Sequence, residues 1–117
     1  MADLREICKY LTPDEILAQM AEEAAEVGHA GLKLRRALIR TNPTPKTVGE
    51  CLDSLQEEFA DVLLSLRTYC EADHLDFDDF IDEMGDIMVK KSDRWLERLK
   101  AEHDWKEGSS NESTNCL

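Results

Sequence analysis

The chain of 117 residues has little glycine and little proline, with 5 and 3 residues respectively. It also has no segment in which apolar and polar residues alternate, the pattern of a half-buried strand. Charged residues make up 34% and apolar residues 42%, enough for one core in a domain of common size. These features predict an all-α protein, an antiparallel helical bundle.

Long apolar runs are absent, and so is a recognisable signal peptide. Basic residues are scarce beside acidic ones, 14 against 26, which gives a net charge of −12. This charge disfavours nucleic acid or an anionic membrane as partner. The four cysteines have neither Cys-x-x-Cys nor zinc-type spacing, so we expect free thiols. The expected protein is soluble and cytoplasmic.

Two common catalytic arrangements are missing as well. The chain has no glycine-rich phosphate loop, which disfavours a P-loop ATPase. Its cysteines and histidines are not spaced as a nucleophile and its base, which disfavours covalent catalysis. If the protein is an enzyme, metal-ion chemistry is what remains.

Three helices are predicted. Capping boxes at residues 12–15 and 47–50 begin the first two, which run to about residues 40 and 69. Prolines in the segment 41–45 separate them. A third helix begins at Phe77 and continues to Leu99, and the sequence leaves open whether Gly85 breaks or kinks it. The predicted domain covers residues 1–105, and the polar residues 106–117 are expected to form a disordered tail.

The first two helices each carry an apolar stripe that we expect to face the core. In the first helix the stripe consists of Ile16, Met20, Ala24, Val27, Gly31, Leu34 and Leu38. In the second helix it consists of Leu52, Leu55, Phe59, Val62, Leu66 and Tyr69. Further apolar residues, among them Leu32 and Leu64, lie off these stripes and predict a second buried face through self-association.

Two acidic motifs lie beside these stripes, Glu23-Ala-Ala-Glu26 and Glu58-Phe-Ala-Asp61. A spacing of three places each pair on one face, at matching offsets of roughly 60° and 120° from the stripe. In an antiparallel hairpin folded about the prolines, Glu26 is expected level with Asp61, with Glu23 and Glu58 on either side. Four converging carboxylates repel one another unless a cation neutralises them. Mg2+, or Mn2+ in its place, is the predicted metal cofactor.

Acidic pairs at this spacing more commonly form a solvated helix face. A single motif favours that interpretation, whereas two matched motifs across one hairpin favour a metal site. Glu22 and Glu57 precede the motifs and are second choices, as ligands or as groups acting on water. Glu83-Met-Gly-Asp86 repeats the spacing without an obvious partner, so we expect it at the surface.

The pattern Glu-x-x-Glu, a loop, then Glu-x-x-Asp-Val-Leu resembles the all-α NTP pyrophosphohydrolases, the MazG-like and dimeric dUTPase-like superfamily, over about residues 13–99. The resemblance implies that the four motif acids, Glu23, Glu26, Glu58 and Asp61, ligate Mg2+. It implies hydrolysis of a nucleoside triphosphate to the monophosphate and pyrophosphate, in a homodimer or homotetramer.

Candidate substrate-binding cations follow from the same patterns. The family often has a Lys, an Asn and an Arg before an aromatic residue on a later helix, and here Lys91 stands where an Asn is usual. Lys90 and Arg94 are one turn apart and are expected to reach one phosphate chain. Lys33 lies on the same side of the first helix as the acids and is a further candidate for substrate binding. Glu57 is the candidate base.

Two other functions compete with this one. A ferritin-like di-iron protein is suggested by Glu26-Val-Gly-His29 and Glu71-Ala-Asp-His74, which match the Glu-x-x-His ligand pair. In the antiparallel hairpin these pairs are offset by about 15 Å, which opposes it. A non-catalytic acidic helical adaptor is compatible with the composition but leaves the paired motifs unexplained.

Overall fold

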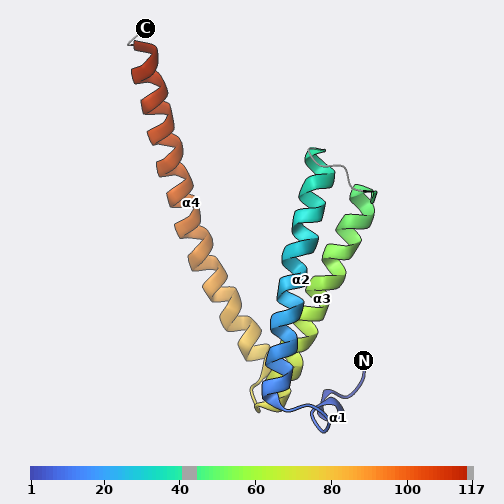
Figure 1. The fold of residues 1–117 in the computed structure, drawn as a ribbon. Coiled ribbons are helices and arrows are strands. Elements are labelled where there is room, and N and C mark those ends of the chain that lie inside the picture. Colours follow the sequence, from blue (N-terminus) through green and yellow to red (C-terminus); the bar gives the residue numbers. More distant parts are fainter. Residues whose placement is uncertain (41–44, 116–117) are drawn as a thin grey trace. The chain divides into compact units, whose positions relative to one another are not determined.

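The computed structural model describes residues 1–40 and 45–115 (Figure 1). This part of the chain contains four helices and no strand: α1 (Leu4–Ile7), α2 (Pro13–Ile39), α3 (Val48–Ala72) and α4 (Phe77–Asn115). The prediction of an all-α protein is therefore confirmed. The chain divides into two compact units, one within residues 1–77 and one from Asp78 onward, and each is described by itself.

Local capping sets the start of both long helices in the first unit. At α2 the Thr12 hydroxyl accepts the Glu15 N–H at 3.1 Å, while the Glu15 carboxylate accepts the Thr12 N–H at 3.1 Å. At α3 the Thr47 hydroxyl accepts the Glu50 N–H at 3.1 Å. These bonds satisfy amide groups that have no partner inside the helix. Both predicted helix starts are confirmed; the predicted turn falls largely on residues 41–44, outside the described residues.

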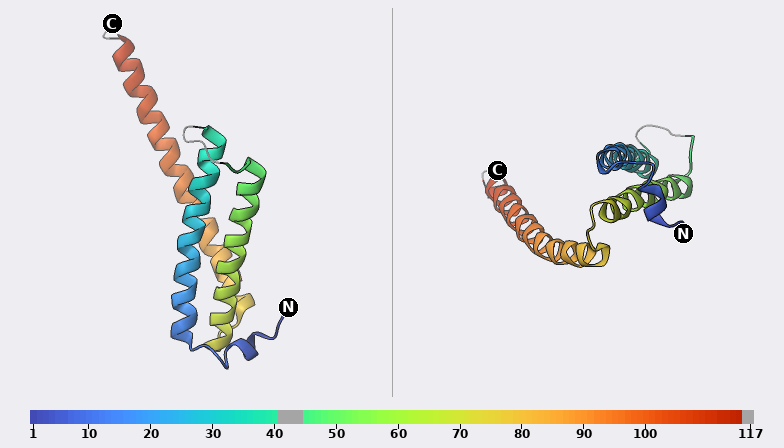
Figure 2. Two further views of the ribbon diagram at one scale, coloured as in Figure 1. Left: turned by 45° about the vertical axis from the view of Figure 1, so that its right-hand side comes forward. Right: turned by 90° about the horizontal axis from the view of Figure 1, so that it is seen from below.

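Helices α2 and α3 lie side by side and run in opposite directions (Figures 1 and 2). We call their line of contact the seam. Its buried side chains are small or β-branched: Ile16 and Ala30 from α2, and Cys51, Ser65 and Thr68 from α3. The seam therefore runs along the sides of α2 and α3 that carry the acidic motifs.

The apolar stripe of α3 is not buried as a whole, which corrects the prediction. Leu52 and Phe59 keep 54% and 56% of their surface exposed, and Leu55 and Val62 are only half-buried. The reason is geometric: one neighbouring helix covers a single strip of a helix surface, and the apolar residues of α3 extend well beyond that strip. Within the chain, small residues hold the hairpin together and much of the larger apolar surface remains exposed.

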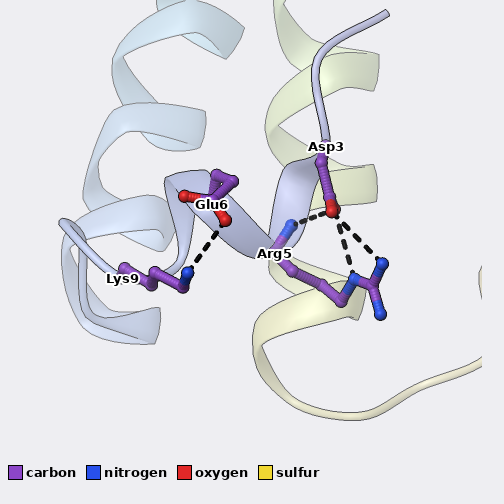
Figure 3. A network of polar contacts seen from close by, with 4 residues as sticks. All are labelled: Asp3, Arg5, Glu6 and Lys9. Carbon is purple, nitrogen blue, oxygen red and sulfur yellow. Dashed lines mark hydrogen bonds and ion pairs between the residues drawn. The ribbon is translucent and has the colours of Figure 1, made fainter.

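Helix α1 packs beside the end of α3, a feature the sequence did not predict. Leu4 is buried, and the Cys8 thiol donates to the Thr68 carbonyl with an Sγ–O distance of 3.8 Å. On its outer side, Arg5 pairs with Asp3 at 3.2 Å and Lys9 pairs with Glu6 at 2.8 Å (Figure 3). Exposed pairs of this kind contribute little, so the buried apolar contact is what fixes α1.

The second unit consists of the remainder of α4. The helix continues through Gly85, which settles the question left open by the sequence, and extends to Asn115. Residues 106–115 are thus helical where low apolar content had predicted a tail; propagating an existing helix is easier than starting one. The domain boundary inferred at residue 105 does not coincide with the division at residue 77 and stays a prediction. No helix in the described ranges is both long and apolar enough to span a bilayer.

The three cysteines within the described residues are free thiols. Cys51 and Cys70 are buried, and burial raises the pKa of the Cys70 thiol. A thiol of raised pKa stays protonated at neutral pH and is a poor nucleophile. Cys51 and Cys70 are packed inside the first unit, and Cys116 lies outside the described residues.

Candidate metal centre

The acidic motifs place carboxylates in the seam itself. Seam positions recur every seven residues along each helix, and the two series are Ile16, Glu23 and Ala30 in α2, and Cys51, Glu58 and Ser65 in α3. Glu23 and Glu58 are half-buried at positions where a helical hairpin normally holds an apolar side chain. Placing ionised groups there costs free energy unless they are paired or bind a cation.

Three carboxylates converge at this point of the seam. Glu23 from α2, and Glu58 and Asp61 from α3, each offer an oxygen atom, and these atoms all lie within 4.8 Å of one another. Glu58 and Asp61 are three residues apart and therefore share a face of α3. An all-oxygen, all-anionic donor set from two helices fits a hard divalent cation such as Mg2+ or Mn2+.

The electrostatics of the cluster are visible at Glu23. Partial burial raises the pKa of its carboxyl group, and the nearby charges of Asp61, Glu58 and Glu26 raise it further. A hydrogen bond with the Asp61 carboxyl acts in the same direction. In the absence of a bound cation, full ionisation of the cluster is therefore disfavoured, as expected for like charges held close together.

The pairing of the two motifs differs from the inferred register. Asp61 lies beside Glu23 rather than level with Glu26, and Glu26 instead lines a hollow together with Glu58. Glu26 is outside the three-carboxylate group, and its Oε2 lies 3.9 Å from Nδ1 of His29. The inference assumed a hairpin folded symmetrically about the prolines, whereas the observed register follows from how the seam residues pack.

Next to the cluster, towards the turn end of the hairpin, is a hollow of about 110 Å³. We call it the lysine hollow; it is lined by Glu26, His29, Ala30, Lys33, Lys46, Cys51, Ser54 and Glu58. Lys33, a candidate from the sequence, is therefore brought to the site. Lys46 was missed: it precedes the N-cap of α3, and only the closure of the hairpin brings it near Glu58. The two lysine side chains place positive charge next to the carboxylates.

The remaining predicted site residues lie elsewhere. Glu57 is exposed on α3 and does not belong to the three-carboxylate group. Lys90, Lys91 and Arg94 are exposed on α4, where Lys91 and Arg94 border a shallow depression beside Trp95. The roles of these four residues stay predictions.

A second group with metal-ligand chemistry lies on α4. It consists of His103, Asp104 and Glu107, all exposed. His103 Nε2 lies 3.5 Å from Glu107 Oε1, the usual proximity of residues four apart on one helix. Because a single solvated helix produces this grouping without any packing, we assign it no role.

The pattern that suggested a di-iron protein does not assemble into a ligand group in the described residues. His74 lies in the turn after α3 with φ of 56°, outside any helix. Neither His29 nor His74 belongs to a group of converging metal-type ligands there. The candidate site is the acidic cluster alone.

Comparisons of this chain with protein-family models, with curated proteins and with solved structures gave no match. The resemblance to the all-α NTP pyrophosphohydrolases therefore rests on the two acidic motifs and their helical setting, and membership of that superfamily stays a prediction.

Proposed function

We propose that this protein is a Mg2+-dependent nucleoside triphosphate pyrophosphohydrolase, which converts a (d)NTP and water to the (d)NMP and pyrophosphate. The observation that carries the proposal is the convergence of oxygen atoms of Glu23, Glu58 and Asp61 within 4.8 Å of one another, with Glu23 and Glu58 half-buried in a helical seam and Asp61 exposed. Such an arrangement weakens the hairpin when no cation is bound, so a function in cation binding explains it better than a solvated acidic surface.

The second support is the charge pattern around the cluster. The chain carries a net charge of −12, which repels a polyphosphate, yet Lys33 and Lys46 line the hollow next to the acids. A cation held by the acids, together with two lysines, reverses the local field and makes a phosphate chain an acceptable ligand. The motif resemblance suggests the reaction class, and the carboxylates with the neighbouring lysines are compatible with it.

In this mechanism Glu23, Glu58 and Asp61 hold the cation, with Glu26 adjacent. Mg2+ supplies charge neutralisation and orientation of the phosphate oxygens when bound. A water oxygen attacks the α-phosphorus, the bond from that phosphorus to the bridging oxygen breaks, and pyrophosphate leaves. A cluster carboxylate or Glu57 accepts the proton of the water. Lys33 steadies the phosphate chain.

Self-association belongs to the same proposal. Phe59 and Leu52 on α3 and Leu32 on α2 are about half exposed, and so is Trp95 on α4. A homodimer or homotetramer buries such surface. In such an assembly we propose that Lys90, Lys91 and Arg94 of α4 steady the pyrophosphate that departs from the site of a second copy.

The testing experiment is chromatography of nucleotide products from a panel of canonical NTPs and dNTPs, with Mg2+ and with a chelator. We expect monophosphate and pyrophosphate with Mg2+ and no turnover without it. Glu23→Gln is expected to remove activity, whereas Glu83→Gln, an exposed acid of the α4 motif, is the matched control. A diphosphate with orthophosphate as products contradicts the reaction. No turnover of any nucleotide contradicts the proposal of an enzyme and favours a non-catalytic acidic helical adaptor.

Control of the nucleotide pool is the role that we propose for this reaction.

A further inference from the structure

Helix α4 carries an apolar stripe that is largely exposed from Met88 onward. At 100° per residue, a set of apolar residues lies within about 40° of one line along the helix. The set includes Ile81, Met84, Met88, Trp95 and Leu99. Met88 and Trp95 keep 65% and 60% of their surface exposed, and Leu99 keeps 47%. A helix with such a face gains free energy when another apolar face covers it.

The charges of α4 are segregated along its length. Residues 78–86 contain acids and no base, namely Asp78, Asp79, Asp82, Glu83 and Asp86. Residues 90–100 contain the bases Lys90, Lys91, Arg94, Arg98 and Lys100. The acids of this second segment, Asp93 and Glu97, lie about 160° from the stripe, on the opposite face of the helix. The sides of the stripe are therefore acidic in the first segment and basic in the second.

We propose that two copies of this chain associate through α4, with the two stripes in contact, the helices antiparallel and the contact centred near Met88. Met88 lies at the boundary between the acidic and the basic segment. In an antiparallel pair, each acidic segment faces the basic segment of the other copy, whereas a parallel pair places acids against acids. The apolar stripe extends to both sides of the same centre, with Ile81 and Trp95 each seven residues away from it.

The pairing is isologous, so one surface provides both halves of the interface and no second patch is needed. Lys90 and Arg94 lie about 140° and 100° from the stripe, so the pairing leaves them available for the phosphate contact proposed above. Lys91 lies at the edge of the stripe. The inference rests on the proposed self-association, to which it assigns an interface, and does not depend on the hydrolase activity.

Two charge-reversal variants test the pairing. Asp78→Lys/Asp82→Lys places bases in the acidic segment, and Arg98→Glu/Lys100→Glu places acids in the basic segment. Each variant by itself brings like charges together, so we expect its dimer to dissociate at a concentration about tenfold higher than the wild type, or more, in sedimentation velocity. An equimolar mixture of the two variants pairs opposite charges again and is expected to dimerise like the wild type.

Asp86→Lys/Glu97→Lys is the matched control. It changes the net charge by the same amount as Asp78→Lys/Asp82→Lys, but both residues are exposed on the face of α4 opposite the stripe. We expect this variant to dimerise at least as tightly as the wild type.

Nitroxide labels measure the orientation, on Asp78→Cys in one copy and Lys100→Cys in the other, in a Cys8→Ser/Cys116→Ser background. An antiparallel pair brings these two sites within a few residues of each other along the helix axis. It separates two labels at residue 78 by about 30 Å along the axis, at 1.5 Å per residue. We expect the distance between the labels to be shorter in the mixed pair than in either pair of equal sites.

The outcomes separate this inference from the proposed reaction. Weakened dimers of both charge-reversal variants, with recovery in their mixture and a short 78–100 distance, support the interface. A dimer that responds to neither variant, or as strongly to the control, overturns it, and so does a shortest distance between two labels at residue 78. A monomeric wild type overturns it together with the proposed self-association. Nucleotide products test the hydrolase independently, because a dimer without turnover retains this interface and turnover without it refutes only the interface.

Discussion

Glu23 is a carboxylate at a position of the seam where an apolar side chain is usual. It stands two turns from Ile16 on one side and two turns from Ala30 on the other, both buried. An apolar side chain at this position would add to the hydrophobic contact between α2 and α3. The carboxylate instead meets Asp61 and Glu58 from the facing helix. This position is better suited to binding a cation than to stabilising the fold.

The pH dependence of stability follows from the raised pKa of Glu23. The folded protein holds this proton more tightly than the unfolded chain, so ionisation of Glu23 lowers the free energy of unfolding as pH rises through its folded pKa. Glu23→Gln removes this ionisation. Without Mg2+, we expect the variant's stability advantage over the wild type to be small in acid and to grow towards neutral pH. Urea denaturation across the range from about pH 4 to pH 7 measures it; an advantage independent of pH contradicts the assignment.

Asp61→Asn separates a ligand role from a structural one. The substitution removes one anionic donor and is expected to lower kcat on the order of 100-fold or more. The apo variant is expected to be as stable as the wild type or more stable, because repulsion with Glu23 is relieved. Mg2+ is expected to raise the melting temperature of the wild type and much less that of the variant. Calorimetry with and without Mg2+ checks this; strong destabilisation of the apo variant would identify Asp61 as a structural residue.

At the scale of the helices, the same segment carries two different faces. The shoulder of α3 with Cys51, Glu58 and Ser65 packs on α2, while the face with Leu52 and Phe59 stays largely exposed. Small side chains allow a close approach of α2 and α3 and leave room beside the acids for the lysine hollow. The packing of α2 on α3 that leaves the apolar stripe of α3 exposed is thus the same packing that brings Glu23, Glu58 and Asp61 together.

Helix α4 offers a test of helix propensity. Gly85 is exposed in mid-helix, and a Cβ added there meets no atom within 4 Å. Gly85→Ala is therefore expected to stabilise α4 by about 0.5–1 kcal/mol. Gly108→Ala, closer to the end of α4, is the comparison and should have a smaller effect because helix ends fray. Amide hydrogen exchange within α4 gives the readout, and slower exchange is the expected result; faster exchange after Gly85→Ala would indicate that another chain approaches Gly85.

On the scale of the whole molecule, exposed apolar surface and high negative charge coexist. The described residues bury few large side chains completely, whereas Phe59, Trp95 and Trp105 are more than half exposed. A charge of −12 favours solubility, but it does not remove the free-energy gain from covering this surface. The expected outcome is specific self-association rather than a monomer.

Sedimentation velocity at micromolar concentration tests the self-association. We expect the wild type to sediment as a dimer or tetramer and Phe59→Glu to shift the population towards the monomer, because a charge in a buried apolar contact is costly. Ala60→Glu is the matched control, since it adds the same charge at the next exposed position of α3. A monomeric wild type with full activity contradicts the proposed assembly.

Features that depend on neighbours along the chain could be predicted from the amino-acid sequence. Thr12 and Glu15 cap α2 because capping involves residues three apart, and Glu58 and Asp61 share a face because the helical period places them there. The all-α class follows from the same kind of local pattern.

Features that depend on contacts between distant segments became clear from the folded structure. Side-chain packing and closure of the hairpin set which side of α3 contacts α2. They therefore also set whether Asp61 lies beside Glu23 or beside Glu26. The arrival of Lys46 at Glu58 and the packing of α1 at the other end have the same origin. A helix has several apolar strips of similar hydrophobicity. Which of them becomes buried depends on the contacts with the partner helix, and a local sequence pattern does not describe those contacts.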